Sequence, residues 1–234
     1  MANYVLIHGS FQGGWIWQPT VERLRQAGHT VYAPTMDGCA ERQRGLRVGI
    51  TATTMAKEVV DLFFYEDLED VILVGTSSGG IIISKAAELA REKIKYLVYI
   101  DALAPQPGET VADIVIRGPN PEPYEETEFA SGLSREGMSA RLFADLEPKL
   151  KKWALDRATL HPKWASAANL DKFWAQNWLA TVIYCTGSLN PSEAHQRRTK
   201  EKLHAYWHAI DAGHYPMLSH GDKTARLLME EISR

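Results

Sequence analysis

The chain has 234 residues, of which 45% are hydrophobic and 24% are charged, and its formal net charge is −3. This composition is that of an ordinary globular protein, and the absence of a basic excess argues against a nucleic-acid partner. At this length we expect one α/β domain with an inserted segment.

The cysteines and the first residues bear on the cellular compartment. Cys39 and Cys185 are too few for a disulfide framework, and we expect both to be free thiols. A strand-like run begins a few residues after Met1, and no basic stretch followed by a long apolar segment precedes it. We therefore expect neither a signal peptide nor a membrane span and predict a cytoplasmic protein.

Short apolar runs alternate with helical patterns along most of the chain. Strands are expected at 3–8, 29–33, 70–75, 95–101, 180–186 and 204–210. Helices are expected at 17–27, 51–68, 78–91, 192–202 and 222–233. The alternation predicts an α/β fold with an open, mainly parallel sheet of about six strands and helices on both faces. Ligands of such sheets bind outside the carboxyl ends of the strands.

The alternation breaks between residues 103 and 180, a stretch far longer than a crossover needs. Helical stretches are expected there around 136–147, 149–158 and 165–178. We predict that 103–180 is a helical cap, inserted before the penultimate strand, over a core formed by 1–102 and 181–234. Four of the seven tryptophans lie in this segment, namely Trp153, Trp164, Trp174 and Trp178. They either roof an apolar pocket or only pack the cap onto the core.

The third expected strand passes through a Gly-x-Ser-x-Gly sequence, residues 75–79, directly into a helical pattern. Ser77 therefore falls on the hinge between strand and helix, where a strained turn would expose its hydroxyl as a candidate nucleophile. Gly75 and Gly79 leave room for the turn, because a larger side chain would collide with the neighbouring backbone. Ser78 fits less well, since Thr76 rather than glycine stands two residues before it.

A serine hydroxyl is a weak nucleophile at neutral pH and needs a nearby base. Of the eight histidines, His214 follows Asp211-Ala212-Gly213 on the loop that leaves the last strand, so it overhangs the same sheet edge as Ser77. We predict that His214 is the base. The other histidines, including His8 in the first loop, are expected to be structural or exposed.

The oxyanion formed by nucleophilic attack needs fixed backbone N–H donors. The N–H of Ser78, which follows the candidate nucleophile at the start of the helix, is the first expected donor. The second should come from the loop after the first strand, Gly9-Ser10-Phe11, and we select Ser10.

Four sequence motifs together resemble the α/β-hydrolase superfamily: VLIHGS at 5–10, GGWIW at 13–17, GTSSGG at 75–80 and Gly213-His214. Within it, the chain is most similar to the branch of small esterases, methylesterases and hydroxynitrile lyases and to its bacterial esterases. The resemblance covers essentially the whole chain, cap included. It implies a catalytic triad with the serine before the histidine, an oxyanion hole and an acyl-enzyme intermediate.

The acid of the triad departs from the pattern of this superfamily. Ser188 occupies the position after the penultimate strand where the family usually has an aspartate. A serine can orient an imidazole but cannot offset its positive charge. Asp101, at the end of the fourth strand, is our choice of acid, because some α/β-hydrolases take it from that strand end. Alternatively, Asp101 only caps the entrance to the inserted segment, and Glu193 is the next candidate.

The resemblance implies a serine esterase that cleaves a small apolar or aromatic carboxylic ester or carbamate. Lyases of the branch typically carry a threonine after the first-strand histidine and a lysine after the catalytic histidine; here these positions are Gly9 and Tyr215, which favour hydrolysis. A carbon–carbon lyase of the hydroxynitrile type and a catalytically weak ligand-binding homologue remain alternatives. The residues expected to form the substrate pocket are Gly9, Phe11, Trp153, Trp174 and Tyr215.

The sequence contains neither a phosphate-binding glycine loop nor a cluster of His and Cys ligands. We therefore expect no metal and no other cofactor. The expected partner is a small-molecule substrate, with no nucleic acid and no membrane involved, and the protein is expected to be a monomer or a homodimer.

Overall fold

The computed structural model describes residues 1–116 and 123–232 of the chain. Its centre is a six-stranded sheet in the order β2-β1-β3-β4-β8-β9, in which every neighbouring pair is parallel. The strands are β1 (Asn3–Ile7), β2 (Thr30–Tyr32), β3 (Val71–Ser77), β4 (Ile94–Ala102), β8 (Ala180–Cys185) and β9 (Tyr206–Ile210). Each expected strand is present within a few residues of its expected bounds, which confirms the predicted parallel sheet.

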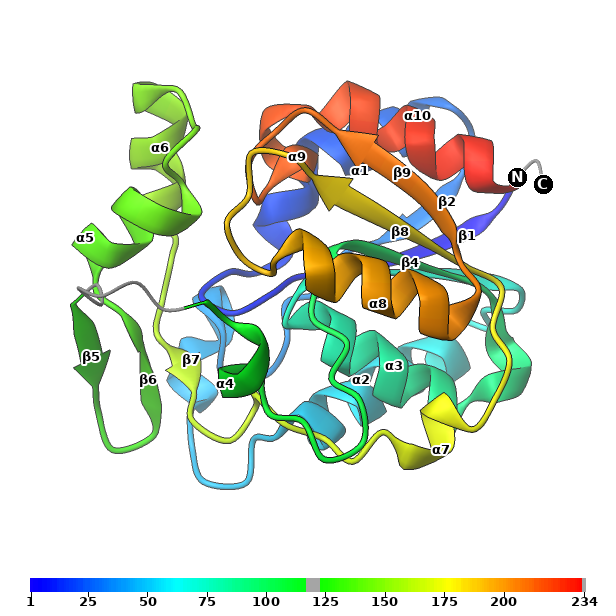
Figure 1. Cartoon of the computed structure of the whole chain (residues 1–234), viewed down its shortest axis with the longest axis horizontal. Helices are drawn as coiled ribbons and strands as arrows, with labels where there is room; N and C mark the ends of the chain where they lie inside the picture. The colour runs from blue at the N-terminus through cyan, green and yellow to red at the C-terminus, as the bar shows by residue number, and fades with distance from the viewer. Residues whose placement is uncertain (117–122, 233–234) are drawn as a thin grey trace.

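Successive residues of the central strands enter two separate hydrophobic cores. In β3, Leu73 packs into one core and Ile72 and Val74 into the other, because alternate side chains point to opposite faces of a sheet. One face is covered by α1 (Gln18–Gln26), α9 (Pro216–Ser219) and α10 (Gly221–Ile232), the other by α2 (Ala52–Tyr65), α3 (Gly79–Leu89) and α8 (Glu193–Leu203) (Figure 1). Both faces of the sheet are therefore buried, as the apolar strand sequences predict.

Outside the insert, the structure also has the short 3-10 helices η1 (Gly14–Trp17), η2 (Ala40–Gly45) and η3 (Arg91–Lys93). The helices expected from the sequence agree with α1, α2, α3, α8 and α10 to within a few residues at each end. For the last of these, the expected residue 233 lies outside the described part of the chain.

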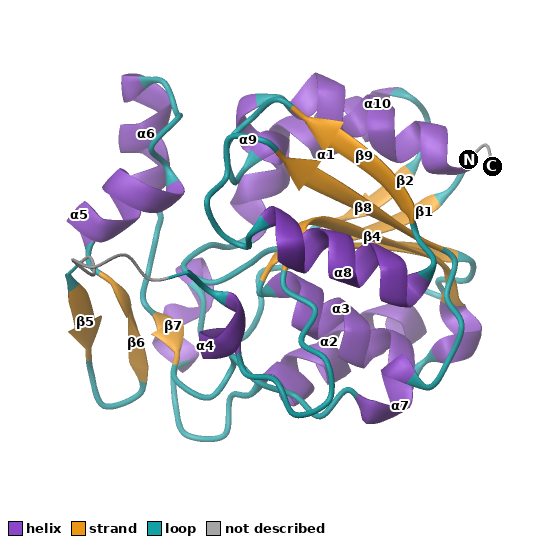
Figure 2. Cartoon of the chain, in the orientation of Figure 1, coloured by secondary structure: helices purple, strands orange, loops and turns teal. Residues whose placement is uncertain are grey.

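The inserted segment is built differently from the expectation of helices alone. It contains a three-stranded antiparallel sheet of β5 (Tyr124–Glu126), β6 (Ala130–Leu133) and β7 (His161–Pro162). Its helices are α4 (Val111–Ile114), α5 (Arg135–Gly137), the π-helical turn η4 (Met138–Leu142), α6 (Pro148–Leu155) and α7 (Asp171–Trp174). Figure 2 sets the small sheet apart from the central one. Sequence periodicity missed it because β5 is exposed along its whole length and has no apolar alternation.

One part of the insert lies beyond the strand ends, and another part packs against α3. The small sheet, α5 and α6 lie on the side of the molecule toward which β8 and β9 point, opposite the chain termini (Figure 1). The last part, around α7, instead packs against α3, where the N–H of Phe173 donates to Glu88 Oε2 (3.1 Å). The helix expected over 165–178 is therefore only one turn long and contacts the core rather than the strand ends.

Gly80 shows how closely α3 is packed onto the end of β4. A Cβ atom at Gly80 would lie 2.3 Å from the carbonyl oxygen of Leu103 and 3.0 Å from Cβ of Ala102. The helix can approach the strand this closely only because residue 80 has no side chain.

We predict that Gly80→Ala lowers the free energy of unfolding by about 2–3 kcal/mol, because the new methyl group displaces α3 from β4. Urea denaturation followed by circular dichroism measures the change. Gly45→Ala is the matched control, since the nearest atom to its added Cβ, Asp37 Oδ1, is 3.3 Å away. Equal stability of the two variants would contradict the packing argument.

Candidate active site

Ser77 lies at a sharp turn between β3 and α3. It is the last residue of β3, and Ser78 caps the helix that begins at Gly79. The backbone of Ser77 has a φ of 52°, a left-handed conformation that costs a non-glycine residue about 1–3 kcal/mol. The predicted hinge is therefore present and strained.

The flanking glycines are required by close approach to the backbone, as predicted. A Cβ atom at Gly75 would lie 2.8 Å from the carbonyl oxygen of Gly79, and one at Gly79 would lie 2.6 Å from that of Ile7. A Cβ at Gly9 would lie 2.5 Å from Cβ of Ser77. The loop after β1 therefore passes directly beside the predicted nucleophile.

The two predicted oxyanion donors belong to segments that are hydrogen-bonded to each other. The hydroxyl groups of Ser10 and Ser78 are 2.8 Å apart, which joins the loop after β1 to the start of α3. The first N–H groups of a helix have no partner within the helix, so the N–H of Ser78 is suited to receive an anion. In the described part of the chain, no hydrogen bond uses the backbone N–H of Ser10.

The buried side chains of His8 and Gln12 hold the loop after β1 through hydrogen bonds. The Nδ1–H of His8 donates to the carbonyl of Gly9 (2.7 Å), and its Nε2 accepts the N–H of Met36 (3.0 Å). Burial lowers the pKa of His8 to about 4, so the ring is neutral and structural, as expected. Gln12, fully buried, accepts the N–H of Gly9 through Oε1 (3.3 Å). Sequence reasoning did not single out Gln12, because a buried amide in a loop leaves no periodic signal.

His214 and Asp101 form a buried pair at the carboxyl edge of the sheet. The Nδ1–H of His214 donates to Oδ2 of Asp101 over 2.6 Å, and the two side chains are 5% and 0% exposed. Asp101 has a left-handed φ of 45°, as Ser77 does on the neighbouring strand. Burial raises the pKa of the Asp101 carboxyl, an effect that the hydrogen bond from His214 opposes.

The other two candidates for the acid have different surroundings. The hydroxyl oxygen of Ser188 lies 3.5 Å from Nδ1 of His214, beside the Asp101 bond. Glu193 lies at the start of α8, and its carboxylate is paired with Arg197 (2.6 Å). The structure therefore brings Asp101, and not Glu193, to His214.

Ser77 and His214 share the same edge of the sheet. Ser77 is in register with Ala102, the neighbour of Asp101, to which His214 is bonded. Within the described ranges, no hydrogen bond joins the hydroxyl of Ser77 to the imidazole of His214. Such bonds are often long without substrate and tighten in the reactive complex. Nδ1 is occupied by Asp101, so Nε2 is the nitrogen that remains for the serine.

The predicted pocket residues are held by different contacts. Phe11 has a left-handed φ of 72°, and its carbonyl accepts the N–H of Thr159 from the insert (3.0 Å). The ring centroid of Tyr215 lies 4.4 Å from that of His214, and the side chain is fully buried. Trp153 packs edge-on against Trp15, at 5.4 Å between centroids.

Trp174 belongs to the part of the insert that packs beside α3. Its indole N–H donates to the carbonyl of Pro105 (2.7 Å), and its ring packs against Phe173. This position beside α3 agrees with the alternative that some tryptophans only pack the insert onto the core.

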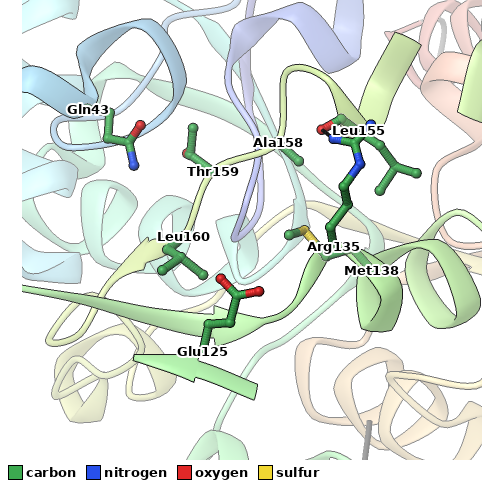
Figure 3. A pocket seen from close by; sticks show the side chains of 8 residues that line it. All are labelled: Gln43, Glu125, Arg135, Met138, Leu155, Ala158, Thr159 and Leu160. Carbon is green, nitrogen blue, oxygen red and sulfur yellow. Dashed lines mark hydrogen bonds between the residues drawn. The ribbon is translucent and has the colours of Figure 1, made fainter. Parts of the chain in front are cut away.

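Two of the cavities in the described part of the chain bear on this arrangement. The larger of these, of about 250 Å³, lies between the insert and η2, and Figure 3 shows its lining: Gln43, Glu125, Arg135, Met138, Leu155, Ala158, Thr159 and Leu160. The smaller, of about 80 Å³, borders His214, Ser188 and Asp145. Neither cavity is lined by Ser77 or by the five predicted pocket residues, so their role in a pocket stays a prediction.

The described ranges, 1–116 and 123–232, also bear on metal binding and on membrane spans. No group of three or more His, Cys, Asp or Glu side chains in these ranges could hold a metal ion. No helix in these ranges has the length and apolar character needed to cross a bilayer. Cys39 and Cys185 are buried free thiols.

The sequence profile of the alpha/beta hydrolase family matches residues 4–227. A carbendazim hydrolyzing esterase of Nocardioides sp. (strain SG-4G) is 39% identical over 122 residues, 52% of this chain and 50% of that protein. An alpha-hydroxynitrile lyase of Arabidopsis thaliana is 31% identical over 152 residues, 64% of this chain and 58% of that protein. The matched region thus spans between half and three fifths of the length of these curated relatives.

Solved structures agree with the fold over nearly the whole chain. An extracellular alpha/beta-hydrolase from a Paenibacillus species superimposes with a TM-score of 0.83 at 23% identity, covering 99% of both chains. A pyrethroid hydrolase from Sphingobium faniae JZ-2 superimposes with a TM-score of 0.77 at 18% identity, covering 98% of this chain and 96% of that one. At these identities the likeness establishes the fold alone.

Buried imidazoles generate a prediction about stability against pH. Burial lowers the pKa of His8 and His195 to about 4 and that of His161 to about 3. In the unfolded chain these three imidazoles take up protons near pH 6.5. Between pH 6.5 and pH 4 the unfolded chain therefore binds more protons than the folded chain. The free energy of unfolding is therefore expected to be highest above pH 6.5 and to decrease as the pH is lowered to 4, by roughly 3 kcal/mol for each imidazole.

Replacing one of these imidazoles should make the free energy of unfolding depend less steeply on pH. His161→Phe removes a ring that packs against Phe11 and Cys39, and urea denaturation across pH 4 to 7 measures the change in slope. His220→Phe, at an exposed position, is the control and should leave the slope unchanged. A wild-type slope in His161→Phe would contradict the lowered pKa of this buried ring.

Proposed function

Because this chain belongs to the alpha/beta hydrolase family, we propose that it is a serine hydrolase that cleaves a small apolar or aromatic carboxylic ester or carbamate through an acyl-enzyme. The observation that carries the proposal is the buried bond of 2.6 Å between His214 and Asp101, one strand away from the strained turn at Ser77. The esterase names of the relatives support the reaction class.

The first half of the reaction forms the acyl-enzyme. Oγ of Ser77 attacks the carbonyl carbon of the ester while Nε2 of His214 takes the hydroxyl proton. The oxyanion of the tetrahedral intermediate accepts hydrogen bonds from the N–H groups of Ser10 and Ser78. The imidazolium then gives its proton to the leaving alcohol as the carbon–oxygen bond breaks.

The second half repeats these steps with water. His214 takes a proton from water as its oxygen attacks the acyl carbon, and Ser77 regains that proton when the acid departs. Asp101 holds Nδ1–H throughout and stabilises the imidazolium, an interaction strengthened by the exclusion of water around a fully buried carboxylate. Oγ of Ser188 lies 3.5 Å from the same nitrogen, beside the Asp101 carboxylate.

The remaining assignments follow from the same proposal. Residues 1–102 and 181–234 form the catalytic core, and 103–180 is the insert, of which the small sheet, α5 and α6 lie beyond the strand ends (Figure 1). Phe11, Trp153 and Tyr215 belong to the surroundings of the acyl and alcohol groups, beside Gly9. The cytoplasmic location and the monomeric or dimeric state expected from the sequence stay predictions.

A carbon–carbon lyase is the second candidate, because one relative is named an alpha-hydroxynitrile lyase. Two positions favour hydrolysis instead. A side chain at Gly9 would meet Cβ of Ser77 at 2.5 Å, so a threonine hydroxyl cannot be placed there without moving the loop. Tyr215 is buried against Phe143 and supplies no ammonium group. Release of cyanide from mandelonitrile at rates above those for esters would reverse this preference.

Ser77→Ala is predicted to abolish the release of 4-nitrophenol from short-chain 4-nitrophenyl esters, because the acyl-enzyme cannot form. The same substitution should prevent labelling by a fluorophosphonate probe. Ser166→Ala, in the segment before α7, is the matched control and should behave as wild type. Full activity of Ser77→Ala would refute the serine mechanism, and a wild-type protein that binds ligands without turnover or labelling would indicate a binding protein.

Asp101→Asn is predicted to lower kcat by about 10³–10⁴-fold, because the neutral amide cannot stabilise the imidazolium. Glu193→Gln should leave kcat within about twofold of wild type, since the carboxylate of Glu193 is paired with Arg197. Steady-state kinetics on a 4-nitrophenyl ester measures both variants. The reverse outcome, with Glu193→Gln inactive and Asp101→Asn active, would assign the acid to Glu193.

A further inference from the structure

A carboxylate from the insert reaches the loop that carries His214. Asp145 lies in the turn between η4 and α6, and its Oδ2 accepts the backbone N–H of Gly213 over 3.0 Å. The two residues are 68 positions apart in the chain. This bond therefore ties the insert to the residue that directly precedes the proposed base.

Gly213 has no side chain where Asp145 approaches. A Cβ atom at Gly213 would lie 2.2 Å from Cγ of Asp145 and 2.3 Å from each carboxylate oxygen. Gly213 is not one of the glycines with a left-handed φ, so backbone conformation does not demand glycine here. The space taken by the Asp145 carboxylate is what excludes a side chain at this position.

The same turn of the insert also holds the residue after His214. Phe143 is fully buried, and its ring centroid lies 5.3 Å from that of Tyr215. Asp145 thus holds the backbone of Gly213, the residue before His214, and Phe143 holds the side chain of Tyr215, the residue after it. The imidazole is positioned from three directions, by Asp101, Gly213 and Tyr215.

A small cavity lies beside the His214 imidazole. The space of about 80 Å³ that borders Asp145 and His214 also borders Ser188, and it is large enough to hold water. If the peptide before His214 were free to shift, the imidazole would have room to turn away from Asp101.

We propose that Asp145 is a positioning residue for the hydrolysis: its bond to Gly213 places the His214 imidazole when the insert is docked on the strand ends. This inference rests on the proposed function. A carboxylate oxygen is a strong acceptor for a backbone N–H, which suits a contact that holds a loop in place. Asp145 touches no reacting atom and acts through His214.

The first test compares Asp145→Ala with Asp145→Asn. On a 4-nitrophenyl ester, Asp145→Ala is expected to lower kcat about 10- to 100-fold with KM within about threefold, because a misplaced imidazole slows the chemical steps more than binding. Asp145→Asn retains an oxygen acceptor and should recover most of the loss. Glu147→Ala, an exposed carboxylate two residues along, is the matched control and should behave as wild type.

A spectroscopic readout makes the test independent of turnover. The Nδ1–H proton of His214 in its bond to Asp101 should give a downfield proton NMR signal, assigned by its absence in His214→Gln. The signal should be lost or broadened in Asp145→Ala and kept in Asp145→Asn. If wild type shows the signal but no esterase activity, the proposed function fails, and the effect of Asp145→Ala on the signal still decides the positioning role.

A double-mutant cycle with Gly213 provides the second variant. Gly213→Ala should lower kcat by a similar factor, because the added methyl group expels the Asp145 carboxylate. In the Asp145→Ala background the same substitution should change kcat less than threefold, since the contact is already absent. Additive losses, a wild-type kcat in Asp145→Ala, or a lower kcat with an unchanged His214 signal would each overturn the proposal.

Discussion

The bond between the His214 imidazole and the Asp101 carboxylate is the constraint on which the rest of the site depends. It connects the last loop of the chain to the end of β4, and both side chains are removed from water. Two residues at adjacent strand ends, Ser77 and Asp101, have strained left-handed backbones. The close packing of α3 and the parallel sheet maintains that strain, and thereby directs a hydroxyl and a carboxylate toward one edge.

The insert takes part in this geometry and does not simply cover it. Thr159 donates to the carbonyl of Phe11, next to a proposed oxyanion donor, and Asp145 accepts the N–H of Gly213, next to the proposed base. The insert therefore contacts both the loop that carries the proposed oxyanion donor and the loop that carries the proposed base.

Local pattern predicted the parts of the molecule that local forces determine. The apolar runs of β1, β3 and β4 and the glycines around Ser77 identified the sheet, the hinge and the likeness to a family. The small sheet was missed because β5 is exposed and carries no apolar alternation. Asp101 could only be weighed against Glu193, and Asp145 was not considered, because both contacts join residues far apart in the chain and leave no mark in the sequence around them.

A crystal structure of the protein after reaction with an organophosphate ester such as paraoxon would test the proposed active site most directly. We expect phosphorus bonded to Oγ of Ser77, a phosphoryl oxygen within hydrogen-bond distance of the N–H groups of Ser10 and Ser78, and the His214–Asp101 bond intact beside it. Phosphorus on another residue, or an adduct on Ser77 with His214 turned away from Asp101, would contradict the proposed mechanism.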